Sequence, residues 1–222
     1  MKEAIETSAK LQNALNRLNC ILPLQESQSK CNAQVKMLHQ QLLHSFVQHG
    51  RILSNAESAV FVDDVAEAFN VLHKYDLITL SHDGEPVGIY PFTMHGRGHT
   101  VHVNGHRVQA MCALDALAIG PMFQESTQIS SQCRVTAAPI AIEMTGQTIQ
   151  NLAEVGNIHI GIGWTAANAS SCCADSLCME MIFLRDNRTA EQWLTDQSEG
   201  REIFTLQEAV QLASMFFLPL LS

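Results

Sequence analysis

The feature that most constrains this 222-residue chain is the run AMCALDALAIG at residues 110–120, in which one carboxylate stands among apolar side chains. The density of Ala, Leu, Ile and Met predicts a helix that is buried in the core. Because Cys112 and Asp115 are three residues apart, a helix places their thiol and carboxylate on one face. A carboxylate that is buried without a partner is costly, so this position needs either a partner or a use.

The composition of the chain allows a large core and excludes some classes of partner. A hydrophobic content of 46% is enough to bury a large core, and a length of 222 residues suits one large domain or two small ones. The formal net charge of −9 argues against a nucleic-acid partner, which requires a basic face, and it disfavours anionic membranes. The N-terminal segment lacks the pattern of a signal or transit peptide, and the C-terminal MFFLPLLS is too short to span a bilayer. We therefore expect a cytoplasmic protein with no membrane partner.

The first ninety residues predict helices followed by a hairpin, which is the pattern of a winged helix. The expected helix at residues 62–73 carries Asp63, Asp64 and Glu67 and has no Arg or Lys before Lys74, so we interpret this part as a scaffold or lid that binds no DNA. The expected elements are helices at residues 2–18, 33–49 and 62–73, a polar linker at 22–32, and strands within 77–92 that are joined by a turn at Asp83 and Gly84.

The second half of the chain is richer in strands and predicts an α+β arrangement with helices packed on the strands. An Asn-Gly turn at residues 104–105 predicts a hairpin that leads directly into the buried helix. We therefore divide the chain into a helical, winged-helix-like domain at residues 1–92 and a strand-rich α+β domain at residues 93–222. Further strands are expected at residues 128–136, 138–145, 157–164 and 178–184, and helices at 189–196 and 205–217.

The cysteines are the residues most able to take part in metal binding or catalysis. Seven cysteines, an odd number in a chain without a secretory signal, predict reduced thiols rather than a disulfide framework. Thiolate sulfur is the preferred ligand of soft metals, and two thiolates from different segments can hold one such ion. Cys133 lies in an expected strand and is interpreted as a small buried apolar residue. Cys172, Cys173 and Cys178 fall within seven positions, a density that core filling does not readily explain.

Two other uses of these residue types compete with a soft-metal site. Zinc is bound by Cys and His together, but the chain has no CxxC pair. A nucleophilic cysteine needs a histidine base, whereas the one-turn spacing of Cys112 and Asp115 leaves no imidazole between them and favours proton transfer between sulfur and carboxylate. The histidines expected on the turn and hairpin, where we expect them to be exposed, are His95, His99, His102 and His106.

Four segments, in this order and approximate spacing, resemble the organomercurial lyase (alkylmercury lyase) family: QAMCALDALAIGPMF, ISSQCRVTAAPIAIEMT, SLCMEMIFL and TAEQW. The likeness extends over roughly residues 30–217 and includes the hairpin DGEPVGIY. It implies an enzyme of mercury resistance and detoxification that cleaves a carbon–mercury bond by protonolysis, giving a hydrocarbon and Hg(II). It also implies that residues 93–222 form the catalytic domain and that no separate cofactor is needed.

The resemblance also implies roles for individual residues. Cys112 and Asp115 match the C-x-x-D pair of the family, and Cys178 matches its second catalytic cysteine. These three residues are then the ligands of mercury, which is both substrate and product. Cys133 matches a cysteine that is regarded as structural. The loop before Cys178 is longer here and adds the pair Cys172–Cys173, for which the expected role is a relay of mercury or none.

The chemistry of these residue types agrees with the implied reaction. Two thiolates that donate to mercury build negative charge on the bound carbon, and a carboxylic acid within reach supplies the proton that the carbon needs. Burial among apolar neighbours favours the neutral form of Asp115. The expected partners are an organomercurial substrate, low-molecular-weight thiols that remove Hg(II), and a mercuric reductase. Two alternatives stay open: a non-catalytic mercury or soft-metal binding protein, and a metal-responsive winged-helix regulator on the same fold.

Overall fold

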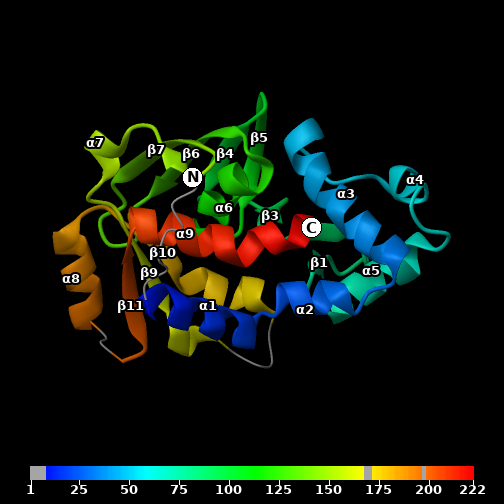
Figure 1. The fold of residues 1–222 in the computed structure, drawn as a ribbon, viewed down its shortest axis with the longest axis horizontal. Helices are drawn as coiled ribbons and strands as arrows, with labels where there is room; N and C mark the ends of the chain where they lie inside the picture. The colour runs from blue at the N-terminus through cyan, green and yellow to red at the C-terminus, as the bar shows by residue number, and fades with distance from the viewer. Residues whose placement is uncertain (1–8, 168–171, 197–198) are drawn as a thin grey trace, which may run out of the picture.

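The computed structural model describes residues 9–167, 172–196 and 199–222. These residues form an α+β fold with one large antiparallel sheet, one small antiparallel sheet, and helices packed around both (Figure 1). The expected α+β class is confirmed, and the winged-helix-like character of the N-terminal part stays a prediction. Among the described residues, no helix has both the length and the apolar character needed to cross a bilayer.

The N-terminal part is helical, as expected. The helix expected at residues 33–49 is confirmed as α3, because the Asn32 side chain accepts the N–H of Val35 at its start and Gly50 ends it in a left-handed conformation. The helix expected at 62–73 begins three residues later, where the side chain of Asp64 caps it. The helices are α1 (Ala9–Ile21), α2 (Leu24–Ser29), α3 (Ala33–His49), α4 (Asn55–Ser58) and α5 (Val65–Lys74); Ile5, included in the first expected helix, lies outside the described residues.

The expectation of a polar linker at residues 22–32 is wrong, because this segment contains α2. The side chain of Gln28 is buried, donates a hydrogen bond to the carbonyl of Leu220 and lies 2.8 Å from Nδ1 of His39. A glutamine that finds partners inside the core behaves as a core residue although it is polar. A search for periodic hydrophobic residues therefore does not identify a buried glutamine such as Gln28.

The large sheet has eight strands in the order β1-β2-β3-β5-β4-β6-β7-β8. The expected Asn-Gly turn joins β4 to β5, and both Asn104 and Gly105 have the positive φ that such a two-residue turn requires. The pairs β2–β3 and β3–β5 continue the sheet across residue 92, and the division into two domains there stays a prediction. The strands are β1 (Ile78–Leu80), β2 (Pro86–Ile89), β3 (Phe92–Thr93), β4 (Thr100–Val103), β5 (His106–Ala110), β6 (Ser126–Gln132), β7 (Pro139–Thr145) and β8 (Thr148–Ile149).

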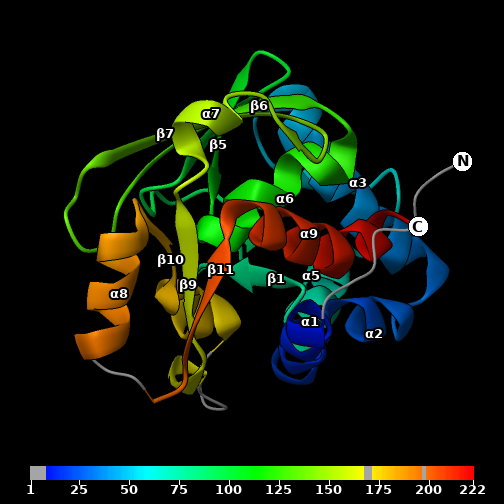
Figure 2. The same ribbon diagram turned by 60° about the vertical axis from the view of Figure 1, so that its left-hand side comes forward.

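The small sheet has three strands in the order β10-β9-β11, and α8 packs beside it (Figure 2). The strand β11 was not expected from the sequence. The expected strand at residues 178–184 begins only at Met181, because Cys178 lies in a 3-10 turn before it. The elements of this part are α7 (Leu152–Val155), β9 (His159–Gly163), η1 (Trp164–Ala166), η2 (Cys173–Asp175), η3 (Leu177–Glu180), β10 (Met181–Leu184), α8 (Asn187–Asp196), β11 (Arg201–Thr205), α9 (Leu206–Phe217) and η4 (Leu218–Leu221).

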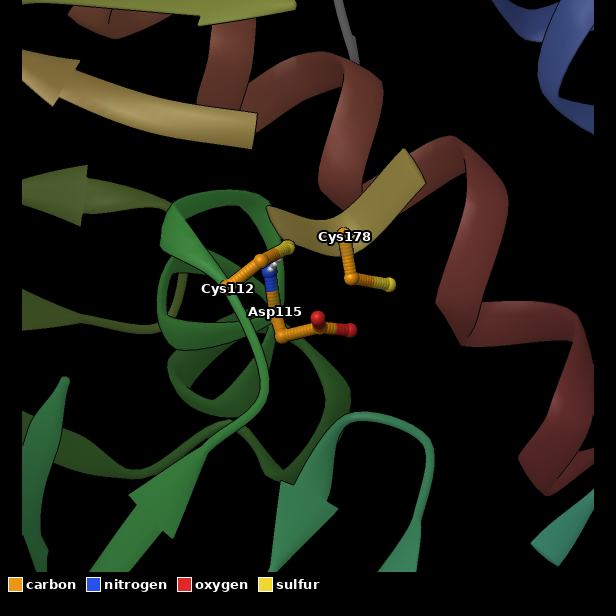
Figure 3. Close-up of side chains that lie close together, drawn as sticks. All are labelled: Cys112, Asp115 and Cys178. Atoms are coloured by element: carbon orange, nitrogen blue, oxygen red, sulfur yellow. Dashed lines mark hydrogen bonds between the residues drawn. The ribbon is translucent and has the colours of Figure 1, made fainter. Parts of the chain in front are cut away.

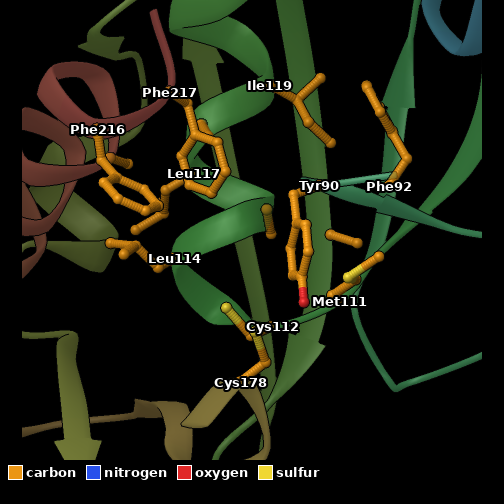
Figure 4. Packing of buried hydrophobic residues seen from close by; sticks show 14 of the residues in the cluster. Tyr90, Phe92, Met111, Cys112, Leu114, Leu117, Ile119, Cys178, Phe216 and Phe217 are labelled. Carbon is orange, nitrogen blue, oxygen red and sulfur yellow. The ribbon is translucent and has the colours of Figure 1, made fainter. Parts of the chain in front are cut away.

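The apolar run folds as α6 (Ala113–Phe123), and every residue of this helix except Phe123 is buried. In Figure 4, Leu114 and Leu117 face Phe216 of α9, while Tyr90 lies on the other side of the helix. The predicted buried helix is therefore confirmed. Because α6 is packed on all sides, its first turn is held at a fixed place in the core.

Candidate active site

The first turn of α6 positions the thiol of Cys112 and the carboxylate of Asp115. Cys112 is the N-cap residue, in extended conformation, and its sulfur accepts the backbone N–H of Asp115 at 3.4 Å. Asp115 occupies the third position of the helix, the usual place of an acidic residue that faces the cap. The expected proximity of thiol and carboxylate is therefore present, and the capping geometry produces it.

Cys178 joins this pair from a segment far along the chain. The sulfur atoms of Cys112 and Cys178 and a carboxylate oxygen of Asp115 all lie within 4.8 Å of one another. Figure 3 shows the three side chains together, two from the start of α6 and one from η3. Their exposed fractions are 1%, 1% and 4%. The structure thus brings together the three residues that the sequence singled out, in a site that is closed to solvent.

The carboxyl group of Asp115 is a weak acid in this site. Burial raises the pKa of Asp115 to about 7, although hydrogen bonds with Cys112 and the charge of Arg97 oppose the shift. Its Oδ2 atom has no hydrogen-bond partner among the described residues. Near neutral pH the group therefore exists in both protonation states, so it can take up a proton and release one.

The two thiols are protonated in the unliganded protein. Burial raises the pKa of Cys112 to about 12. The pKa of Cys178 is also raised, first by its hydrogen bond with Cys112, then by that with Cys173, and then by burial. Thiols must lose their protons to bind a metal. A soft metal ion that binds here therefore displaces protons into a site where the Asp115 carboxylate is an acceptor within 4.8 Å of both sulfurs.

A third sulfur touches the cluster. The sulfur of Cys173 lies 3.8 Å from that of Cys178, and the Cys173 side chain is buried. The backbone N–H of Cys173 donates to Asp76 and that of Ala174 donates to the Tyr90 hydroxyl, which itself donates to Asp76. These hydrogen bonds hold Cys173 in place, while the preceding residues 168–171 lie outside the described part of the chain.

Sequence reasoning missed the residues that hold this segment. Asp76 lies between α5 and β1, and Tyr90 directly follows β2. Both are far from the cysteines in the sequence, and no spacing motif links them to the segment around Cys173. Arg97 donates to Asp175 at 2.6 Å and also to the carbonyl of Ala174. A positive φ of 52° at Asp76 is unusual for a non-glycine residue, but this conformation becomes visible only in the folded chain.

The remaining candidate residues lie outside the cluster. Cys133 is buried directly after β6, and its backbone N–H donates to the carbonyl of Ala138. The expected exposure of the four histidines holds for His95 and His102 but is wrong for His99 and His106, which are half-buried. Burial and the charge of Arg134 lower the pKa of His99 to about 4. The cluster of Cys112, Asp115 and Cys178 contains no histidine, which disfavours both zinc and a histidine-assisted nucleophile.

The comparisons with known proteins identify the family. The family model described as alkylmercury lyase matches residues 92–218, more than half of the chain. The chain belongs to the alkylmercury lyase family. It is 26% identical over 172 residues to the alkylmercury lyases of Bacillus cereus and Clostridium butyricum, which covers 74% of this chain and 77% of each relative.

Other alkylmercury lyases are more distant. That of Pseudomonas putida is 22% identical over 123 residues, covering 55% of this chain and 56% of the relative. The crystal structure of the mercury-bound form of MerB2 superimposes with a TM-score of 0.73 and 16% identity, over 97% of this chain and 100% of that one. At this identity the likeness shows that the two chains share a fold, and the fold extends beyond the matched residues into the N-terminal helices.

Proposed function

We propose that this protein is an organomercurial lyase that cleaves the carbon–mercury bond of organomercury compounds by protonolysis, giving a hydrocarbon and Hg(II). One observation carries the proposal: two thiols and a carboxyl group lie within 4.8 Å of one another in a closed site, and Oδ2 of that carboxyl has no hydrogen-bond partner in the described part of the chain. Membership of the alkylmercury lyase family favours this enzyme over a non-catalytic mercury-binding protein and over a winged-helix regulator.

In the proposed reaction, Asp115 moves the proton and the two cysteines hold the metal. As the sulfur of Cys112 binds the mercury of the substrate, its proton passes to the carboxylate of Asp115. Cys178 then binds as the second thiolate and displaces the thiolate that mercury carried into the site, which leaves with the proton of Cys178. Two protein thiolates on mercury increase the negative charge on the carbon. Asp115 then gives its proton to this carbon, and the carbon–mercury bond breaks. The hydrocarbon leaves, and Hg(II) stays bound to the two thiolates.

The environment of Asp115 suits both halves of this proton transfer. A general acid–base group is most efficient when its pKa lies near the working pH, and burial raises the pKa of Asp115 to about 7. The closed site keeps out water, which otherwise competes as a proton source and weakens the interaction between the acid and the charge that develops on carbon. Mercury here is a substrate, and the proposal includes no separate cofactor.

Release of the product requires another thiol. Because two protein thiolates bind Hg(II) tightly, low-molecular-weight thiols are proposed to remove it, and a mercuric reductase is the proposed next acceptor. All seven cysteines are free, which supports a reducing, cytoplasmic location. The order of α3, α5 and the β1–β2 hairpin supports a winged-helix-like unit within residues 1–92, with residues 93–222 as the catalytic domain.

Methane release from methylmercury in the presence of excess thiol tests the proposal. We expect Cys112→Ser, Cys178→Ser and Asp115→Asn each to lose on the order of 100-fold or more in the rate of methane release, because each removes a metal ligand or the proton carrier. Cys20→Ser is the control, since Cys20 is exposed. A wild-type protein that binds Hg(II) without releasing methane contradicts the lyase and supports the non-catalytic alternative. Near-normal release by Asp115→Asn contradicts the acid assignment alone.

A further inference from the structure

Cys178 has two other buried cysteines close to its sulfur atom, Cys112 and Cys173. The sulfur of Cys178 lies within 4.8 Å of that of Cys112 and 3.8 Å from that of Cys173. The proposed reaction uses only Cys112 and Cys178. Cys173, which is also buried with an exposed fraction of 4%, therefore has no role in bond cleavage although it contacts a residue that does.

The position of Cys173 is fixed by hydrogen bonds that do not involve sulfur. Asp76 accepts the N–H of Cys173 at 3.3 Å, and the Tyr90 hydroxyl accepts the N–H of Ala174 at 2.8 Å. Cys173 and Cys178 are only five residues apart, in two consecutive 3-10 turns. The two thiols are thus presented to each other by one short, anchored segment, and a pair of adjacent thiols is a chelating site for a soft metal ion.

We propose that Cys173 and Cys178 form a second dithiol site, which receives Hg(II) from the Cys112–Cys178 pair after the carbon–mercury bond is broken. The proposal rests on the proposed function. In the transfer, a bond forms between mercury and the sulfur of Cys173, the bond between mercury and Cys112 breaks, and the thiol proton of Cys173 ends on the sulfur of Cys112. No atom is oxidised or reduced, and Cys178 remains bound throughout.

This transfer restores the Cys112 thiol beside Asp115 at the start of α6. Once mercury has moved, Cys112 is again a protonated thiol, and Asp115 is no longer beside a metal-bound thiolate of its own helix. The ion is then held by two residues of the 173–178 segment. Product release and renewal of the proton-transfer pair thereby become separate steps.

A binding measurement with HgCl2 tests the second site independently of catalysis. Cys112→Ser removes the cleavage pair and keeps the proposed one, so we expect this variant to hold one equivalent of Hg(II) through two sulfurs, counted by X-ray absorption, in competition with dithiothreitol. The double variant Cys112→Ser/Cys173→Ser is expected to lose at least about tenfold in affinity, because one sulfur cannot chelate. The matched control is Cys112→Ser/Cys172→Ser, which is expected to bind as Cys112→Ser does.

Two binding results overturn the proposal. The first is a Cys112→Ser variant that holds no Hg(II) through two sulfurs, and the second is equal affinity in Cys112→Ser and Cys112→Ser/Cys173→Ser. Circular dichroism verifies the fold of each variant. If the Cys173→Ser change prevents folding, Cys173→Ala replaces it with a small apolar side chain that suits a buried position.

Turnover kinetics separate this proposal from the lyase function itself. In Cys173→Ser, the steady-state rate of methane release is expected to fall by about tenfold relative to the first-turnover rate, whereas Cys172→Ser keeps the wild-type ratio. A ratio that is unchanged in Cys173→Ser overturns the transfer role. If the wild type releases no methane, the lyase function fails, whereas the HgCl2 measurements still decide whether the second dithiol site exists.

Discussion

The burial of Asp115 has a direct consequence for the pH dependence of stability. The pKa of this carboxyl is about 7 in the folded chain, against an ordinary value of 3.8 in an unfolded one. Between these two pH values the folded protein holds a proton that the unfolded chain has lost. The free energy of unfolding therefore falls by about 1.4 kcal/mol for each pH unit in this window as the pH rises.

The replacement Asp115→Asn removes this dependence because the amide does not titrate. The full contribution of the neutral acid is present below pH 3.8 and is lost as the pH rises through about 7, which amounts to a free energy on the order of 4 kcal/mol. We therefore expect the stability of Asp115→Asn, relative to wild type, to increase by about that amount between pH 4 and pH 8. The gain reaches a plateau above pH 7 because Asp115 is then ionised in both states.

Urea unfolding at a series of pH values measures this difference. Trp164 and Trp193 are both buried, so their fluorescence reports the loss of the core, and a phosphine reductant keeps the thiols free. The control is Asp63→Asn, which alters an exposed carboxylate and is expected to follow the wild-type curve. A stability difference between Asp115→Asn and wild type that is constant from pH 4 to pH 8 refutes the reasoning, since Asp115 then titrates alike in the folded and unfolded chains.

Three further predictions follow from the site and its supports. Without added thiol, hydrocarbon release is expected to stop near one equivalent per protein, as measured by gas chromatography, and sustained turnover contradicts the need for an external acceptor. Tyr90→Phe leaves the N–H of Ala174 without its acceptor and is expected to cost about 1–3 kcal/mol in urea unfolding; an unchanged midpoint contradicts this. Gly161→Ala places a Cβ 2.8 Å from a ring carbon of Trp193, so a loss of about 1–3 kcal/mol is expected, and equal stability shows that the ring can shift.

Local patterns predicted the parts of the fold that local forces determine. The helix at residues 33–49 has its own cap at Asn32 and its own stop at Gly50, and the hairpin of β4 and β5 has the turn residues that its geometry requires. The pair Cys112 and Asp115 could also be predicted, since both residues belong to one helical turn.

Contacts between distant segments could not be predicted in the same way. Cys178 was expected at the start of a strand, but the chain makes a 3-10 turn there, and this turn directs its sulfur toward both Cys112 and Cys173. The anchoring of Cys173 depends on Asp76, which is 97 residues away in the sequence. Likewise, α2 was missed because its buried glutamine is satisfied by groups that are distant in the sequence. Such positions are decided by tertiary hydrogen bonds, for which a single sequence contains no periodic signal.

The same property of Asp115 that lowers stability at neutral pH gives the site its chemistry. The Asp115 carboxyl is buried, and its Oδ2 has no hydrogen-bond partner among residues 9–167, 172–196 and 199–222, so it carries a desolvation cost that a more polar pocket removes. Such a pocket also returns the pKa toward 3.8, and the carboxyl is then a base that is too weak to take a proton from a thiol as mercury binds. Hydrogen-bond donors around Asp115 would therefore stabilise the fold and slow the reaction. Stability gained in this way and activity are expected to change in opposite directions at this residue.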